Sequence, residues 1–375
     1  RLYAKAKYKK EKKYVVWLTT APIGGAVHEY RLSGIAERIS IKDENLYFDS
    51  ATNPQKNILN YINNASVVII NRPLISGKCG QIIHYAKKKG CKLIADLDDA
   101  VTSEMFYCNG RYLSYNQKNL VIKDGQMQEA ALLSFEYITV SSDFLKAYYQ
   151  DTFKEKVFLL RNKIFSGKID LDIDHVKEPR APIKIAIFSG SITHDHDIQT
   201  IILELITLKY FYNFELYFIG KSNVIDNYRD FKKLPFVKYN DSIKQMRYFD
   251  IIVAPLAFND FNTAKSNIRF LEAGKAGKVI FAPNIGEFKS SITDGVNGFL
   301  YNEGKFLDKF IEITKPHVHD GKLDIISFRK QLSVLAKASQ KTVEEKYTTS
   351  THSDDDLDFK YLINKLLDRK EVDLS

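Results

Sequence analysis

The sequence lacks any apolar run long enough to form a membrane-spanning helix. Such a helix takes about 20 predominantly apolar residues, and no run in the 375 residues approaches that length. The first residues also lack the charged, apolar and small-residue order of a secretory signal peptide. We therefore expect a cytoplasmic protein, whose membrane contacts would be peripheral, at the inner face of the cytoplasmic membrane.

Cysteine is also scarce. The three cysteines, Cys79, Cys91 and Cys108, are odd in number and show no C-x-x-C spacing. This usage fits a reducing cytoplasm better than a disulfide framework.

A basic surface for nucleic acid is missing as well, although the formal net charge is +9. Residues 1–13 hold seven basic residues and one acidic residue, whereas the other 362 residues carry 48 basic and 45 acidic side chains. The nearly neutral remainder argues against a nucleic-acid partner. We interpret residues 1–13 as a basic lead-in, either a solvated connecting helix or a patch that contacts anionic lipid. Because the sequence begins at Arg1 rather than Met, we also expect that it was excised from a longer polypeptide or lost its start; residues 1–13 would then contact the membrane or join the chain to further domains.

The length of 375 residues predicts two domains. Apolar runs in the first half are apolar throughout, as in strands buried on both faces of a parallel sheet. They are YVVWLT (14–19), SVVIIN (66–71), KLIAD (92–96), YITV (137–140) and KVFLL (156–160). Helical patterns separate them, for example at residues 80–89 and 141–150. This alternation predicts a Rossmann-like α/β domain over residues 14–172.

The pattern pauses over residues 173–182, a polar stretch that we interpret as a linker. It restarts with IKIAIF (183–188), ELYFIG (215–220), DIIVAPL (250–256), KVIFAP (278–283) and GFLY (298–301). These runs predict a second Rossmann-like domain over residues 183–345. Residues 346–375 predict an amphipathic closing helix with the apolar residues Leu357, Tyr361, Ile363, Leu366 and Leu367. Two such sheets place ligands beyond the carboxyl ends of their strands, in a shared cleft.

The strongest candidate site lies in Phe261–Phe288. Ser266 is expected to cap a helix over residues 267–275, whose amino-terminal amides and dipole favour a phosphate. Lys265 adds a positive charge beside it, and the Glu272 carboxylate can accept hydrogen bonds from both hydroxyls of a ribose. The alternative is a solvated surface, with Arg269, Glu272 and Lys275 paired along the helix.

This segment resembles the donor-binding signature of retaining GT-B glycosyltransferases similar to family GT4. The shared elements are F-N-x-x-K-S (261–266), the glutamate in the following helix, a strand, and D-G-x-N-G-F (294–299). The resemblance implies a GT-B fold with two Rossmann-like domains facing a cleft. It also implies that the donor is bound by Asn262, Lys265, Ser266, Asn267 and Glu272.

A second segment, FSGSITHDHD (188–197), follows the first strand of the second domain. It is similar to the G-S/T-x-T-H-x-x-D that opens the second domain of some of these transferases, which implies a donor loop of Gly190, Ser191, Thr193 and His194. His194 would touch the pyrophosphate or the sugar. Residues 194–197 could alternatively bind a metal or cap the next helix.

In the first domain, Gly24 and Gly25 resemble the family's glycine-rich loop, which lies against the donor phosphate and the acceptor; the pair could also simply form a turn. Arg72 follows another strand, either facing the cleft or in a structural ion pair.

Asp96-Leu97-Asp98 matches the metal-binding D-x-D of GT-A enzymes, yet two domains are evident here. We expect no metal, and expect Asp98 or Asp99 to orient the acceptor hydroxyl or accept its proton. One departure from the family is Ala264, which replaces a glutamate that contacts the donor sugar.

The resemblance implies a glycosyltransferase of the hexosyltransferase type. It would move a sugar from a nucleotide-sugar donor to a glycan or lipid-linked acceptor in bacterial O-antigen or capsule-like polysaccharide synthesis, with retention of configuration and no cofactor. Lys265 would neutralise the leaving diphosphate. Two alternatives remain open: a non-catalytic GT-B module within a larger synthase, and a sugar-nucleotide epimerase or hydrolase on the same fold.

Overall fold

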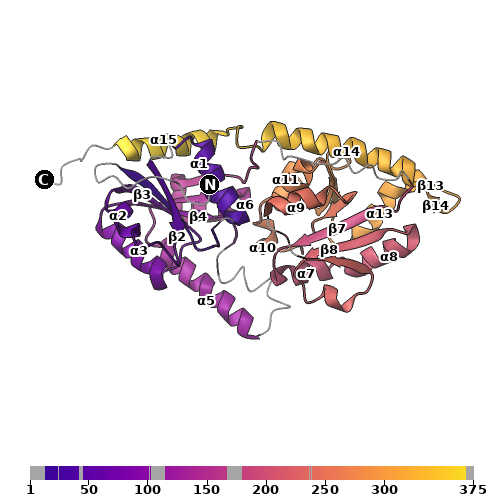
Figure 1. Ribbon diagram of the computed structural model, residues 1–375, viewed down its shortest axis with the longest axis horizontal. Coiled ribbons are helices and arrows are strands. Elements are labelled where there is room, and N and C mark those ends of the chain that lie inside the picture. The colour runs from indigo at the N-terminus through magenta and orange to yellow at the C-terminus, as the bar shows by residue number, and fades with distance from the viewer. Residues whose placement is uncertain are drawn as a thin grey trace.

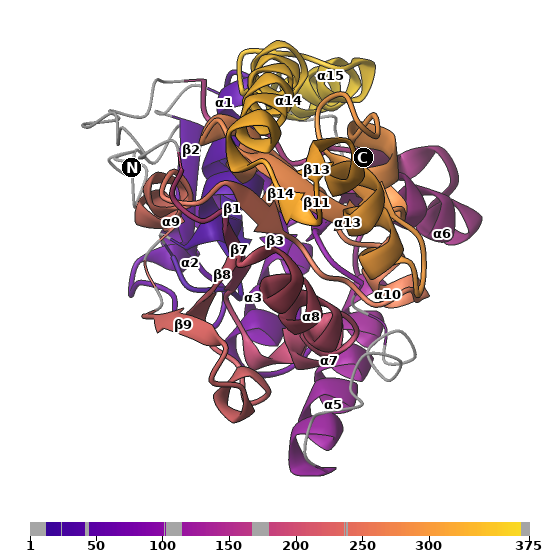
Figure 2. The ribbon, with the colours of Figure 1, turned by 90° about the vertical axis from the view of Figure 1, so that its right-hand side faces the viewer.

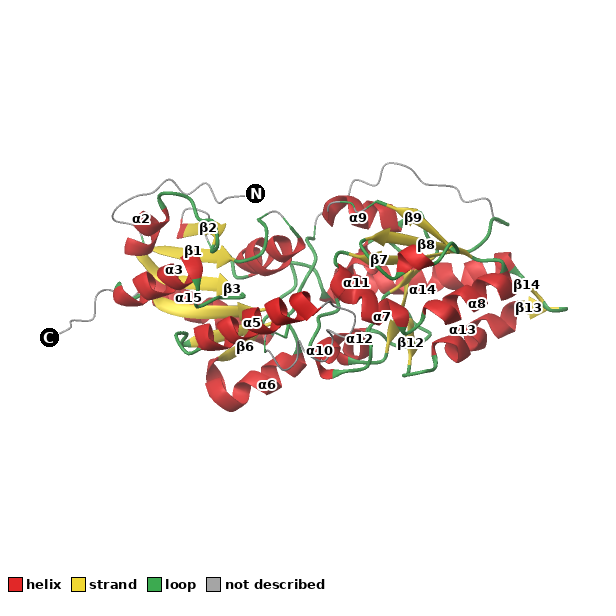
Figure 3. Cartoon of the chain, turned by 90° about the horizontal axis from the view of Figure 1, so that it is seen from below, coloured by secondary structure: helices red, strands yellow, loops and turns green. Residues whose placement is uncertain are grey.

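The computed structural model describes residues 13–23, 25–41, 45–100, 102, 115–166, 180–235, 237 and 239–368. In these ranges the chain forms two α/β domains side by side along the long axis of the molecule (Figure 1). Each domain holds a six-stranded sheet packed against helices, as the view from below shows (Figure 3). The predicted fold of two Rossmann-like domains is confirmed. Residues 1–12, Gly24, Cys108 and residues 173–179 of the expected linker lie outside the described residues.

The sheet of the amino-terminal domain is parallel and has the order β2-β1-β3-β4-β5-β6. Its strands are β1 (Tyr14–Thr19), β2 (Leu46–Ser50), β3 (Ala65–Asn71), β4 (Lys92–Leu97), β5 (Tyr137–Val140) and β6 (Val157–Leu159). The helices of this domain are η1 (His28–Ser33), α1 (Gly34–Arg38), α2 (Ile58–Asn63), α3 (Gly77–Lys88), α5 (Tyr115–Leu132) and α6 (Asp143–Phe153). The strand order reverses between β1 and β3, which places a topological switch point there.

The sheet of the carboxyl-terminal domain is also parallel and has the order β12-β11-β10-β7-β8-β9. Its strands are β7 (Lys184–Ser189), β8 (Glu215–Gly220), β9 (Phe231–Leu234), β10 (Ile251–Val253), β11 (Val279–Pro283) and β12 (Phe299–Tyr301). The helices are α7 (Asp195–Gln199), α8 (Ile202–Tyr212), α9 (Tyr239–Met246), α10 (Asp260–Thr263), α11 (Ile268–Lys275), α12 (Gly286–Ser291) and α13 (Phe306–Thr314). Here the switch point lies between β7 and β10.

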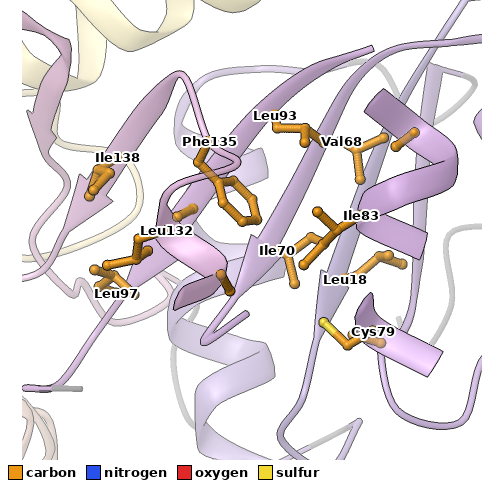
Figure 4. Close-up of a cluster of buried hydrophobic side chains, with 14 of the residues drawn as sticks. Leu18, Val68, Ile70, Cys79, Ile83, Leu93, Leu97, Leu132, Phe135 and Ile138 are labelled. Atoms are coloured by element: carbon orange, nitrogen blue, oxygen red, sulfur yellow. The ribbon is translucent and has the colours of Figure 1, made fainter. Parts of the chain in front are cut away.

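The core of the amino-terminal domain lies on both faces of its sheet, and the larger of its two clusters packs against α2, α3 and α6. Leu18, Val68, Leu93 and Ile138 come from four neighbouring strands of the sheet and belong to one cluster with Ile83 of α3; Leu18 and Val68 lie beside Ile83, and Ile138 lies at the far side of the cluster (Figure 4). Each such side chain contributes about 1.5 to 3 kcal/mol when it is fully removed from water. Cys79 and Cys91 are buried free thiols, and burial raises the pKa of each to about 11. These two cysteines are therefore packing residues.

The chain ends in two long helices on one side of the molecule (Figures 1 and 2). α14 (Ile325–Lys346) covers the carboxyl-terminal domain, and it packs so closely on α11 that a Cβ at Gly274 would lie 2.6 Å from Val343. α15 (Asp354–Asp368) crosses back and buries Phe359, Ile363 and Leu366 against the amino-terminal domain.

The face of α15 differs in part from the expected one. Leu357 and Tyr361 are 52% and 70% exposed, because the buried stripe follows Phe359 at spacings of four and seven residues. No helix within the described ranges is long and apolar enough to cross a membrane.

Candidate active site

Two adjoining cavities lie between the domains, at the switch points of both sheets. The first has a volume of about 250 Å³ and is lined by Arg72, Asp98 and Asp99 from one domain and by His194 and Lys265 from the other, among others. The second, of about 290 Å³, includes Gly25, Gly190, Tyr239, Arg269 and Glu272 in its lining. Both are lined by Ala26, Phe188, Ser189 and Arg269, so they form one continuous cleft.

The amino terminus of α11 lies at the first cavity, which is lined by Ser266, Ile268 and Arg269. The expected cap is displaced by one residue: Asn267 is the N-cap, and its side chain makes no capping hydrogen bond. Ser266 is not the cap, and its Oγ accepts a hydrogen bond of 2.8 Å from Nδ2 of Asn162 in the other domain. The first amides of α11 and the positive end of its dipole still favour an anion here.

Lys265 precedes this helix and is 17% exposed. Its Nζ lies 4.0 Å from Oδ2 of Asp99 and 4.7 Å from the ring centre of Phe261. The ammonium group thus reaches across the cleft toward the amino-terminal domain.

Glu272 lies in the second turn of α11 and is only 3% exposed. Its Oε2 accepts a 2.6 Å hydrogen bond from Arg269, and its Oε1 accepts one of 3.4 Å from the hydroxyl of Tyr30. Burial raises the pKa of Glu272, although Arg269 and Tyr30 act in the opposite direction. The carboxylate therefore sits in a desolvated pocket that reaches from one domain to the other.

Tyr30 was not anticipated from the sequence, nor was its neighbour Arg31. Both lie on η1, a π-helical turn, a type of irregularity that often occurs at functional sites. Tyr30 faces the cleft, where its hydroxyl accepts a 2.7 Å hydrogen bond from Tyr239. Their pairing is invisible in the sequence because 209 positions separate them.

Arg31 is fully buried and pairs with Asp96. Its Nε and Nη2 donate to the two carboxylate oxygens at 3.2 and 2.5 Å. The hydroxyl of Thr139 and the amide of Asn71 donate to the same carboxylate. Asp96, the first aspartate of the D-x-D sequence, is thus engaged in the core of the domain.

Asp98 holds Arg72 in place. Nε and Nη2 of Arg72 donate to its two oxygens at 2.6 and 2.8 Å. Burial acts to raise the pKa of Asp98, but Arg72 and Arg31 bring it below its ordinary value, so Asp98 is a weak proton acceptor. The backbone of Arg72 has a φ of 49°, and strain of this kind is found at functional sites.

His194 reaches the first cavity from the short helix η5 (Ile192–His194). Its Nδ1 lies 2.9 Å from Oδ2 of buried Asp197, whose Oδ1 accepts from the backbone of Ala257 and the amide of Asn262. Burial acts to raise the pKa of Asp197, but His194 and Lys265 bring it below its usual value. Asp195 instead accepts from Ser222 and Asn223, and the described residues contain no group of three or more His, Cys, Asp or Glu placed to hold a metal.

Several expected donor residues do not line either cavity. The amide of Asn262 is used by Asp197, and that of Asn267 donates to Ser291. Ser191 accepts from Thr193, and the two form a local turn. Gly24 lies outside the described residues.

Ala264, where the resemblance in sequence predicts a glutamate, is fully buried in the core of the amino-terminal domain together with Phe261. Its carbonyl oxygen accepts a 2.7 Å hydrogen bond from Ser142. A glutamate side chain here would bury a carboxylate among apolar groups, which is costly without a partner. The packing of the domains thus accounts for the small residue.

No known family model matches the sequence, and no curated protein matches it either. Solved structures share its fold. A glycosyltransferase from Rickettsia africae superimposes with a TM-score of 0.60 at 13% identity, over 96% of this chain and 100% of the other. HepE from Anabaena, in complex with UDP-glucose, gives 0.62 at 14% identity, over 94% and 99%. A sucrose-phosphate synthase from Thermosynechococcus elongatus gives 0.61 at 10% identity, over 94% and 99%. The chain therefore has the GT-B fold of these transferases.

Proposed function

We propose that the chain is a glycosyltransferase that takes a sugar from a nucleotide diphosphate donor. The observation that carries the proposal is the placement of Lys265, just before α11, and Glu272, in the second turn of α11, in one cleft. From the first residue of α11, Ile268, to Glu272 the helix rises by about 6 Å. A ribose diphosphate can therefore place its phosphates at Lys265 and its two free hydroxyls at Glu272.

The main catalytic need of such a transfer is to neutralise the charge that grows on the departing diphosphate. Lys265, Arg72 and the first amides of α11 surround the first cavity and meet this need without an obligatory metal. His194, oriented by Asp197, adds a hydrogen-bond donor on the same side. Loss of one such group typically costs about 10²- to 10³-fold in turnover.

The acceptor would enter from the amino-terminal domain, past Gly25 and Asp99. We assign it to the glycans or lipid-linked glycans of bacterial surface polysaccharides, and the reaction to retention of configuration, on the resemblance of residues 188–197 and 261–299 to retaining transferases. Contact with the inner face of the membrane through residues 1–13 belongs to the same proposal.

Two NMR experiments test this function. Saturation-transfer NMR with UDP, GDP and dTDP sugars should detect binding of one donor, with CMP sugars, which carry one phosphate, as the comparison, and NMR of the product formed with an acceptor should show the anomeric configuration of the donor retained. Binding of none of these sugars would refute the function, whereas an inverted product would refute retention alone. Conversion of the donor to an epimer without an acceptor would identify an epimerase.

A non-catalytic nucleotide-binding module is the second candidate, favoured by Ala264. The glutamate that contacts the donor sugar in related enzymes is absent, and the position is fully buried. Such a module would bind the donor but would neither transfer nor hydrolyse its sugar, so turnover decides between the two.

A further inference from the structure

Two consecutive carboxylates follow β4 at the cleft, and the structure gives them different surroundings. Asp98 is 9% exposed, with both oxygens engaged by Arg72 and Oδ1 also by Asn71. Asp99 is 21% exposed at its side chain and lines the first cavity. The Asp98 carboxylate is fixed, whereas that of Asp99 is accessible.

The Asp99 carboxylate is held loosely. Its Oδ1 accepts a 3.1 Å hydrogen bond from the backbone of Ala100. Its Oδ2 lies 3.7 Å from Nη2 of Arg72 and 4.0 Å from Nζ of Lys265, too far for hydrogen bonds, and these are its ion pairs among the described residues. Partly exposed pairs of this kind contribute about 0 to 1 kcal/mol, so a stronger anion can replace the carboxylate.

Arg72 and Lys265 come from different domains and converge on this one oxygen. In the cleft as described, the two positive charges that a diphosphate would meet are balanced by two carboxylates: Asp98 pairs with Arg72, and Asp99 lies between Arg72 and Lys265. A diphosphate carries more negative charge than one carboxylate, so it would replace Asp99 beside Lys265 and beside the Arg72 guanidinium, which stays paired with Asp98. Repulsion between the bound diphosphate and the Asp99 carboxylate would then turn Oδ2 of Asp99 toward the rest of the cavity.

We propose that Asp99 is a catalytic residue that accepts a hydrogen bond from the acceptor hydroxyl, once the donor diphosphate has displaced its carboxylate from Arg72 and Lys265. The inference rests on the proposed function, because it requires a diphosphate at Lys265. Asp98 is in turn a positioning residue that acts through Arg72. The geometry implies an order in which the donor binds before the acceptor.

Calorimetric titration with UDP and hydrolysis of UDP-glucose, in which water takes the place of the acceptor, test this role. Asp99→Ala removes an anion that competes with the diphosphate, so UDP should bind about two- to fivefold more tightly. The same variant leaves the attacking water unoriented, so hydrolysis should fall by about 100-fold. Asp99→Asn keeps an acceptor oxygen without the charge, and should bind UDP as tightly while retaining more hydrolysis than the alanine variant.

Asp151→Ala, at an exposed position on α6 of the same domain, is the matched control and should change neither quantity. If Asp99 had a purely structural role, Asp99→Ala would lower UDP affinity and hydrolysis together. If Asp99 acted only through its charge at the phosphate, Asp99→Ala would not lower hydrolysis. Either result would overturn the assignment. Failure of the wild-type protein to bind UDP, GDP, dTDP or CMP would instead count against the proposed function.

Discussion

Asn162 of the amino-terminal domain donates a 2.8 Å hydrogen bond to Ser266 at the start of α11. Asn162 is 1% exposed, and its Oδ1 accepts a 3.1 Å hydrogen bond from Arg31. Arg31 is in turn paired with Asp96 at the end of β4. One chain of hydrogen bonds therefore runs from the core of the amino-terminal domain to the start of α11 in the other domain, where we propose that the diphosphate binds. It fixes the position of this helix end in the cleft.

Asn162→Ala should weaken nucleotide binding without removing any group from the cavity. The substitution breaks the contact with Ser266 and should lower the free energy of unfolding by about 1 to 3 kcal/mol, because buried partners are left unpaired. A double-mutant cycle with Ser266→Ala measures the direct interaction, with an expected coupling of about 0.5 to 1.5 kcal/mol. Strictly additive effects would show that the bond does not link the domains.

Asp96→Asn should destabilise the amino-terminal domain strongly. It leaves the fully buried guanidinium of Arg31 without its counter-charge, which typically costs about 3 to 5 kcal/mol. Urea unfolding measures the loss. Glu136→Gln, which removes one charge from the partly exposed pair with Lys92, is the matched control and should cost less than about 1 kcal/mol. Equal losses in the two variants would contradict the assignment of Arg31 to the core.

Tyr30→Phe should tighten nucleotide binding by about two- to fivefold. The Tyr30 hydroxyl lies 3.4 Å from Oε1 of Glu272, where a ribose hydroxyl would donate, so its removal frees that oxygen. Calorimetric titration with UDP gives the affinity. Tyr239→Phe, which leaves the Tyr30 hydroxyl in place, provides the comparison, and weaker binding by Tyr30→Phe would show that Tyr30 contacts the nucleotide instead of competing with it.

Glu272 should give nucleotide binding a dependence on pH. Burial raises its pKa above the ordinary value of 4.5. The carboxylate form accepts the ribose hydroxyls, so affinity should fall as the pH is lowered through this raised pKa, at a higher pH than for a solvated glutamate. The free energy of unfolding changes with pH in the opposite direction. Because the pKa is higher in the folded than in the unfolded protein, the protonated group stabilises the fold below pH 4.5, and this stabilisation is lost as the pH rises through the raised pKa.

Glu272→Gln has no carboxylate, so it should bind UDP weakly at every pH. Its free energy of unfolding should also lack the decrease that the wild-type protein shows as the pH rises through the raised pKa of Glu272. Titration of both proteins with UDP between pH 4 and 8, together with their melting temperatures, gives the comparison. Parallel profiles for wild type and variant would show that another group titrates.

The sequence predicted the fold well because buried parallel strands leave continuous apolar runs, and ten of the twelve strands of the two sheets correspond to such runs. The two that were missed are edge strands. β9 reads FKKL, with both lysines exposed, and β2 (LYFDS) has three apolar residues followed by two polar ones. Neither shows the long apolar run of a central strand.

The site was predictable where its residues are neighbours in the sequence. Lys265, Ser266 and Glu272 belong to one motif and do line the cleft. Tyr30, Arg31 and Asn162 act through partners 65 to 242 positions away, which only the packing of the domains reveals. Asn262 and Asn267 belong to the same motif as Lys265, but their amides are satisfied inside the domain.

Sugar transfer by Lys265→Ala and Glu272→Ala tests the central claim most directly, with the wild-type protein and the exposed control Asp151→Ala measured alongside. If these two residues hold the diphosphate and the ribose, each substitution should lower turnover at a fixed, subsaturating donor concentration by about 100-fold or more, while the melting temperature and near-ultraviolet circular dichroism show an intact fold. Near-wild-type turnover in both variants would contradict the account.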